Sequence, residues 1–278
     1  MIDGLRLVAS GLTWPESPRW REGRLWISDV HNFRLIRLDP DSGTIDREWQ
    51  GPGRPAGMGF LPDGRQLLAT ALGRELLWVE PEGGLAQAAD LAPLARRLLN
   101  DMVVDGQGRA WVGDTGFLFG SDEPPRPGAL LCFHPDRGAR VVADNIGFPN
   151  GIAITPDGGT LYLAETTANR ITAFDIRADG TLANRRIHAE LEASPDGLCL
   201  DAEGALWVPL LFHKQYHRIA ADGRVLERIV FERENAIACV LGGEDRRTLF
   251  LCVSEINEGV RLGAVYARRV DVAGAGLP

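Results

Sequence analysis

The sequence contains few cysteines, and they form no cross-linking or metal-binding pattern. Four of its 278 residues are cysteine, and none belongs to a CxxC pair. Each lies in an apolar stretch, which predicts reduced thiols in the core and argues against a disulfide framework or a cysteine zinc site. The four residues are Cys132, Cys199, Cys239 and Cys252.

Basic clusters and long apolar runs are missing as well. The formal net charge is −8 and no basic run stands out, so no nucleic-acid partner is expected. No stretch of about 18 apolar residues occurs, and the N-terminal segment lacks the basic and apolar regions of a signal peptide. We therefore expect a cytoplasmic protein, a monomer or small homo-oligomer, with no membrane partner. The serine-hydrolase motif Gly-x-Ser-x-Gly is also absent from the sequence.

A turn followed by a short apolar run recurs six times along the chain. The turn is rich in Gly, Asp or Arg, and an aromatic or large residue follows it, as in REGRLWISD and DAEGALWVP. Successive copies lie about 40 to 50 residues apart, which is the length of a four-stranded propeller blade. The anchors of the six copies are Trp26, Leu68, Trp111, Tyr162, Trp207 and Phe250.

Each copy has the pattern of antiparallel strands. Alternating runs such as 34–39 and 170–176 follow the anchor, and Asp-Gly turns separate strands. A β-sandwich also contains many short strands, but it does not predict six similar spacings. The sequence therefore predicts one all-β domain over residues 1–278, a six-bladed β-propeller with four-stranded antiparallel blades around a central channel.

Two segments bear on how such a ring closes and what covers it. Residues 5–10 precede the first copy and residues 264–272 follow the sixth, so the N-terminal segment is expected to add a strand to the last blade. The longest interval between anchors contains a Pro-rich insertion at 117–133. The insertion is expected to form either a lid over the channel or a longer exposed loop.

Polar side chains recur at one position of the repeat, about ten to twelve residues before the anchor. Innermost strands surround the axis of a propeller, so residues at this position should converge. Two carboxylates and two amides would meet there, and a hard divalent cation would relieve the cost of burying them. The residues at this position are Glu16, Gly57, Asn100, Asn150, Asp196 and Ala238.

Each of these polar side chains also has an ordinary interpretation. Asn150 and Asp196 both precede glycine, as in common turns. Asn100 could cap a turn, and Glu16 could be a surface charge between two prolines. Their shared place in the repeat favours one metal site over four unrelated features. Carboxylate and amide oxygens suit calcium first, with magnesium, manganese or zinc as alternatives.

The motifs that carry these residues resemble those of the regucalcin/gluconolactonase family, in the same order and spacing. The resemblance covers about residues 12 to 254. It implies a six-bladed propeller that hydrolyses lactones with a bound divalent metal. The motifs are WPESPRW, LLNDMVVDGQGRAWVGD, FPNGIAITPDGGTLYLAET and SPDGLCLDAEGALWVP.

The resemblance also implies roles for individual residues. Glu16, Asn150 and Asp196 match the metal ligands of the family, and Asn100 matches an asparagine that lies beside the metal and contacts substrate or water. Asp196 is the candidate for a ligand that also acts as base, and Asn100 for a group that donates its amide to the oxyanion. Asp101 is a further candidate for a carboxylate behind the ligands.

One departure from the family bears on the substrate. Relatives that act on sugar lactones often carry arginine two residues before the Asn100 position, where this chain has Leu98. A less polar lactone or ester is therefore expected. Apolar walls are predicted from Trp14 and Phe148, with Tyr216 as a further residue at the channel mouth.

Taken together, these features predict a metal-dependent hydrolase that opens a lactone or similar cyclic ester. Two alternatives remain at this level. The chain could be a non-catalytic propeller that binds calcium or another ligand. The same metal site could also support a different reaction, such as isomerisation or cyclisation.

Overall fold

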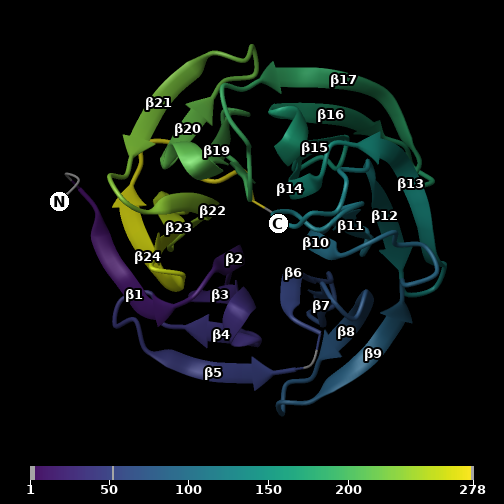
Figure 1. Cartoon of the computed structure of the whole chain (residues 1–278), viewed down its shortest axis with the longest axis horizontal. Helices are drawn as coiled ribbons and strands as arrows, with labels where there is room; N and C mark the ends of the chain where they lie inside the picture. The colour runs from purple at the N-terminus through teal and green to yellow at the C-terminus, as the bar shows by residue number, and fades with distance from the viewer. Residues whose placement is uncertain (1–3, 52, 277–278) are drawn as a thin grey trace.

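The computed structural model describes residues 4–51 and 53–276, which form six four-stranded antiparallel sheets. The sheets follow one another in chain order around a central channel (Figure 1). This architecture confirms the predicted six-bladed propeller. In the described residues, no helix has the length and apolar character needed to cross a membrane.

Within each blade the first strand lies beside the channel and the last lies at the outer edge (Figure 1). Blade one contains β2 (Pro15–Arg21), β3 (Arg24–Asp29), β4 (Arg34–Leu38) and β5 (Ile45–Gln50). Blade two contains β6 (Pro55–Phe60), β7 (Gln66–Thr70), β8 (Glu75–Val79) and β9 (Leu85–Asp90). Blade three contains β10 (Leu99–Val104), β11 (Ala110–Asp114), β12 (Gly128–His134) and β13 (Gly138–Ile146).

The second half of the ring repeats this arrangement. Blade four contains β14 (Pro149–Ile154), β15 (Thr160–Glu165), β16 (Arg170–Ile176) and β17 (Leu182–Glu190). Blade five contains β18 (Cys199–Leu200), β19 (Leu206–Leu210), β20 (Gln215–Ile219) and β21 (Val225–Val230). Blade six contains β22 (Asn235–Gly242), β23 (Thr248–Asn257), β24 (Val260–Arg269) and β1 (Arg6–Leu12). Short 3-10 turns follow the second strand of three blades: η1 (Val30–Asn32), η2 (Thr166–Ala168) and η3 (Leu211–His213).

Blade six is built from both ends of the described chain. The N-terminal strand β1 pairs antiparallel with β24, with Arg6 opposite Ala267 and Leu12 opposite Gly263. The chain thus closes the ring by supplying the outermost strand of the last blade, as the sequence predicted. The pairing gives blade six the same four strands as the other five blades.

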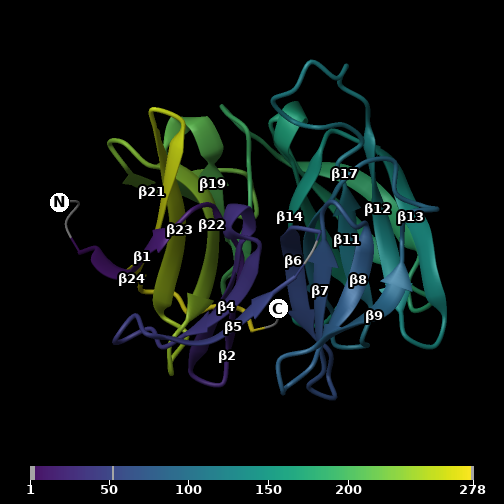
Figure 2. The same cartoon turned by 60° about the horizontal axis from the view of Figure 1, so that its bottom comes forward.

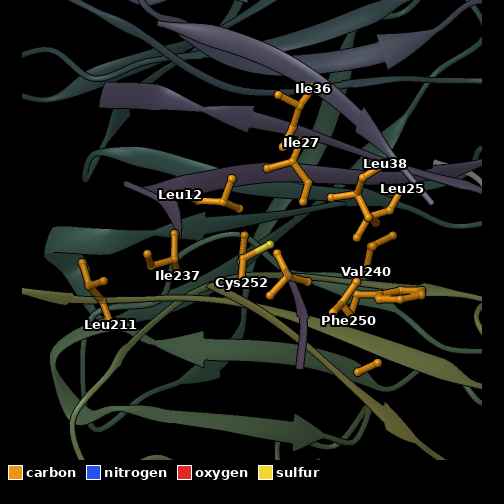
Figure 3. Close-up of a cluster of buried hydrophobic side chains, with 14 residues drawn as sticks. Leu12, Leu25, Ile27, Ile36, Leu38, Leu211, Ile237, Val240, Phe250 and Cys252 are labelled. Carbon is orange, nitrogen blue, oxygen red and sulfur yellow. The ribbon is translucent and has the colours of Figure 1, made fainter. Parts of the chain in front are cut away.

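Apolar side chains from facing sheets hold adjacent blades together. Figure 3 shows one such cluster, in which Leu25 and Ile27 of blade one pack against Val240 and Phe250 of blade six. At the same boundary Trp20 stacks on Phe250, with ring centroids 5.5 Å apart. Burial of these surfaces from water is the main driving force for the assembly of the ring. The four cysteines are free and largely buried, as expected from their apolar context.

A β-bulge interrupts the start of the innermost strand in five of the six blades. In β2 the register shifts between Glu16 and Arg19, and β6, β10, β14 and β22 show the same irregularity. Bulges bend a strand and redirect its side chains. The bulge therefore turns the second residue of the strand toward the channel.

The structure corrects the predicted position in blade two. Pro15, Pro55 and Pro149 all begin their strands, so the residue equivalent to Glu16 and Asn150 is Ala56 rather than Gly57. Gly57 occupies the next position along.

In blades two and four, the innermost strands pack so closely that only glycine fits at the position after Ala56 and Asn150. A Cβ added at Gly151 would lie 2.5 Å from the carbonyl oxygen of Asp196, and one at Gly57 would lie 2.1 Å from the amide nitrogen of Met102. The Asn-Gly and Asp-Gly pairs are therefore parts of adjoining channel segments, not surface turns.

Candidate metal and substrate site

A cavity of about 230 Å³ lies at the end of the channel where the innermost strands begin. Seven of the eight predicted site residues line it, because the strand starts of different blades converge there. These seven are Trp14, Glu16, Leu98, Asn100, Phe148, Asn150 and Asp196.

Asn150 and Asp196 each present a buried oxygen with no hydrogen-bond partner among the described residues. The amide nitrogen of Asn150 donates to the hydroxyl of Thr166 at 3.1 Å, and that hydroxyl donates to the Pro195 carbonyl at 2.8 Å. Thr166 thus fixes the amide so that its oxygen stays free. Unpartnered buried oxygens are costly in a native protein unless an ion or water engages them.

Glu16 supplies a third oxygen group beside these two. Its Oε1 accepts a hydrogen bond of 2.9 Å from the indole nitrogen of Trp14. Burial raises the pKa of Glu16 well above its usual value, and the carboxylates of Asp196 and Asp101 raise it further. Burial and Asp101 raise the pKa of Asp196 in the same way. The site therefore concentrates negative charge that a cation would stabilise.

A buried ion pair lies beneath these carboxylates. Asp101 accepts hydrogen bonds from the Ser17 hydroxyl at 2.7 Å and from its neighbour's amide, Met102 N–H, at 2.8 Å. Arg19 lies 3.2 Å from the same carboxylate oxygen and donates from Nε to the Met58 carbonyl at 3.1 Å. The Asp101 carboxylate is therefore fixed in position by its own partners, beside the carboxylates of Glu16 and Asp196.

This donor set fits a hard divalent cation. In the part of the chain that the structure describes, no group of three or more His, Cys, Asp or Glu side chains suits a metal. A metal at the channel mouth would therefore need the amide oxygen of Asn150 together with the carboxylates of Glu16 and Asp196. Oxygen-only coordination of this kind is typical of calcium and related ions.

Asn100 and Leu98 occupy the side of the cavity formed by blade three. The amide nitrogen of Asn100 donates to the Pro149 carbonyl at 3.1 Å, which fixes the amide plane beside Asn150. Leu98 is buried among Ala56, Ala71 and Leu118. Neighbouring Arg97 instead forms an ion pair of 3.0 Å with Glu123 in the insertion.

Tyr216 does not reach the cavity. It is fully buried between blades five and six, where its hydroxyl donates to the Cys252 carbonyl and accepts from the Ile237 amide at 3.3 Å. The sequence predicted a loop at residues 212–217 that would bring Tyr216 to the mouth, but Tyr216 belongs to strand β20, which turns its side chain into the interblade core. Its predicted contact with substrate has no support from this position.

The insertion contributes to the cavity wall. Its residues Leu118 and Phe119 line the cavity, and Phe119 packs against Phe148 and Phe212 with ring centroids 5.4 and 6.1 Å apart. Phe119 thus bridges from blade three to blades four and five. The loop between β11 and β12 that carries these residues rises beyond the strands of the ring (Figure 2).

Sequence reasoning missed two arginines that line the same cavity, Arg54 and Arg261. Arg54 precedes Pro55 just as Phe148 precedes Pro149, and both have a positive φ of 61°. The residue before a strand-initial proline was therefore the sequence signal that could have identified Arg54 as a cavity residue. Arg261 lies in the β23–β24 hairpin, where the sequence carries no repeat signal at all.

The fold and this oxygen-lined channel mouth define a class of propeller proteins with a small polar site on the axis. The chain belongs to the family described as SMP-30/Gluconolactonase/LRE-like region, which it matches over residues 14–255.

Similar proteins support this assignment. A 6-deoxy-6-sulfogluconolactonase from Pseudomonas putida is 28% identical over 95% of this chain and 93% of its own. A pentonolactonase from Haloferax volcanii is 27% identical over 98% of this chain and 96% of its own. The solved structure of a luciferin-regenerating enzyme superposes with a TM-score of 0.85 at 19% identity, covering 98% of both chains. The last similarity concerns the fold alone.

Proposed function

We propose that this protein is a lactonase that depends on a divalent metal and converts a cyclic ester to the open hydroxy acid. The observation that carries the proposal is the pair of free, buried oxygens on Asn150 and Asp196, next to Glu16. The names of two full-length relatives, both lactonases, support the reaction.

Glu16, Asn150 and Asp196 would hold the metal, and calcium suits their oxygens best. When bound, such an ion would polarise the lactone carbonyl and make water more acidic. The protein's own contribution is a fixed arrangement of donors in a cavity lined largely by apolar side chains. Thr166 supports this arrangement by its bond to the Asn150 amide.

The reaction needs a base for water and a donor for the carbonyl oxygen. The Asp196 carboxylate would accept a proton as water attacks the carbonyl carbon, and Asn100 would donate its amide N–H to the oxygen that gains charge. The acyl–oxygen bond of the ring then breaks. The departing ring oxygen takes up the proton, and the product is a hydroxy acid.

The test is a panel of γ- and δ-lactones, followed by acid release, with protein treated with chelator and then given Ca²⁺, Mg²⁺, Mn²⁺ or Zn²⁺. We expect chelation to abolish activity and one of these ions to restore it. Asp196→Asn should lose activity while keeping the thermal transition of a folded propeller. The matched control is Asp222→Asn, in an exposed turn of the same blade, which should behave as wild type.

Two results would reject the proposal. One is hydrolysis at wild-type rate by chelated protein or by Asp196→Asn. The other is tight binding of a divalent ion with no turnover of any lactone, which would favour the binding-protein alternative.

A further inference from the structure

Arg54 is a cation held in the cavity without an ion-pair partner. Its Nε is buried and has no hydrogen-bond partner among residues 4–51 and 53–276. Burial lowers the pKa of Arg54, the charge of Arg261 lowers it further, and only Glu16 opposes this. Arg54 is half-buried, and a partly desolvated guanidinium of this kind is stabilised when an anion enters beside it.

Arg261 of blade six adds a second positive charge at the same cavity. Its guanidinium carbon lies 6.0 Å from the ring centroid of Trp14, and it lines the same cavity. His31 lines the same cavity, and burial followed by the charges of Arg261 and Arg54 lowers its pKa to about 4. His31 is therefore a neutral hydrogen-bonding group at neutral pH, and the two arginines carry the charge.

These groups come from blades six, one and two, which adjoin one another because the ring closes between blades six and one (Figure 1). The half of the cavity formed by blades three, four and five is largely apolar, and it meets the cationic half where Leu98 packs against Ala56 and Ala71 of blade two. Its walls are Leu98, Leu118 and Phe119 from blade three, Phe148 from blade four and Leu211 from blade five. The cavity therefore has a cationic half and an apolar half, with the oxygen ligands on the axis between them.

We propose that the substrate is a lactone that carries an anionic group, a carboxylate, sulfonate or phosphate, which Arg54 and Arg261 bind on the cationic half of the cavity. This inference rests on the proposed lactonase activity and specifies its substrate class. It replaces the less polar lactone that Leu98 suggested. Leu98 belongs to the apolar half of the cavity, whereas the arginines that would bind the charge come from blades two and six.

The ligand carboxylates do not account for these arginines. No carboxylate in the described chain lies within ion-pair distance, 4.0 Å, of Arg54 or Arg261. The ion pair that does serve the carboxylates is formed by Arg19 with Asp101, beneath the site. Arg54 and Arg261 are thus free to serve a ligand.

The experiment compares lactones of one ring size that carry an uncharged hydroxymethyl, a carboxylate, a sulfonate or a phosphate, using metal-restored protein. We expect wild type to favour at least one anionic lactone by ten-fold or more in kcat/KM, mainly through KM. Arg54→Gln and Arg261→Gln should each lower the ratio of anionic to neutral kcat/KM by about ten- to hundred-fold. The anionic substituent that gives the largest ratio of anionic to neutral kcat/KM identifies the group that the arginines bind.

Two control variants separate charge recognition from other effects. Arg65→Gln removes an exposed arginine from the far end of the same blade as Arg54 and should keep the wild-type ratio. Phe148→Leu alters the apolar half and should change KM for anionic and neutral lactones alike. Equal kcat/KM for both classes in wild type would overturn the proposal. Arginine variants that slow both classes equally would also overturn it.

A second readout distinguishes failure of this inference from failure of the lactonase proposal. Cyclic ethers that carry the same substituents cannot be hydrolysed, and their binding is measured by calorimetry. Binding of an anionic ether that is lost in Arg54→Gln, with no lactone opened, supports the anion site and rejects the lactonase. Lactone hydrolysis with no charge preference, and equal binding of anionic and neutral ethers, supports the lactonase and rejects the anion site.

Discussion

Adding a divalent cation to chelator-treated protein should raise its unfolding temperature, and the rise should depend on pH. Glu16 and Asp196 are buried close to each other and to Asp101, and burial together with these charges raises the pKa of both. Without a cation, ionising them destabilises the folded state. A cation that binds only the folded site reverses this effect.

The size of the effect follows from the length of the chain. An ion present at about 100 times its dissociation constant stabilises the folded state by about 2.7 kcal/mol. For 278 residues, an unfolding entropy of about 2.1 cal/mol/K per residue amounts to about 0.6 kcal/mol/K. The expected rise in Tm is therefore about 5 °C.

The sign of the pH dependence follows from the raised pKa values. A carboxyl group whose pKa is higher in the folded state contributes stability that is fully present below its unfolded pKa, about 4. That stability is lost as pH rises through the folded pKa. The chelated protein should thus lose stability from about pH 4 upward. The rise in Tm on adding cation should be small near pH 4 and grow toward neutral pH, because protons compete for the same oxygens.

Intrinsic fluorescence of the seven tryptophans provides the assay. Glu16→Gln and Asp196→Asn should abolish the cation-dependent rise, and chelated Glu16→Gln should be more stable than chelated wild type at neutral pH. Asp222→Asn should retain the full rise. The reasoning is refuted if Asp196→Asn shows the wild-type rise, or if the rise is the same at pH 4 and pH 8.

Three further substitutions test supporting contacts. Thr166→Val should weaken divalent-ion binding by about ten-fold in calorimetry because it frees the Asn150 amide, whereas Thr166→Ser should not. Arg19→Met should lower the free energy of unfolding in urea by about 3–5 kcal/mol, because it leaves Asp101 buried without its partner; a cost below 1 kcal/mol would contradict this role. Tyr216→Phe should cost about 1–3 kcal/mol through the lost hydroxyl bonds, and a changed KM would instead place it at the substrate.

The repeat made the architecture predictable from sequence. Similar intervals between aromatic or large anchors fix the number of blades, and the segments outside the repeat predicted how the ring closes. The same periodicity brought Glu16, Asn150 and Asp196 to one place, because equivalent positions of innermost strands converge on the axis. The location of a site that is assembled from equivalent positions of a repeat can therefore be predicted from the sequence alone.

The cationic half of the cavity, with Arg54 and Arg261, could not be predicted from the repeat. Counting back from the anchor gave Gly57 in blade two, because the interval between the start of the innermost strand and the anchor differs from blade to blade. The position that reaches the cavity in that blade is the residue before proline, Arg54. Arg261 reaches the cavity from the hairpin between β23 and β24, the two middle strands of blade six, at a position that has no counterpart in the repeat.

The positions just after and just before the start of the innermost strand have different roles in the site. The residue after the strand-initial position lines the cavity and carries the oxygens proposed to bind the metal, as in Glu16 and Asn150. The residue before the strand lies at the rim, and Arg54 and Phe148 hold the same backbone conformation there with opposite chemistry. No hydrogen bond links either rim side chain to a ligand oxygen in the described structure. Substitution at the rim can therefore change which lactone enters while the ligand oxygens, and the chemistry they support, stay in place.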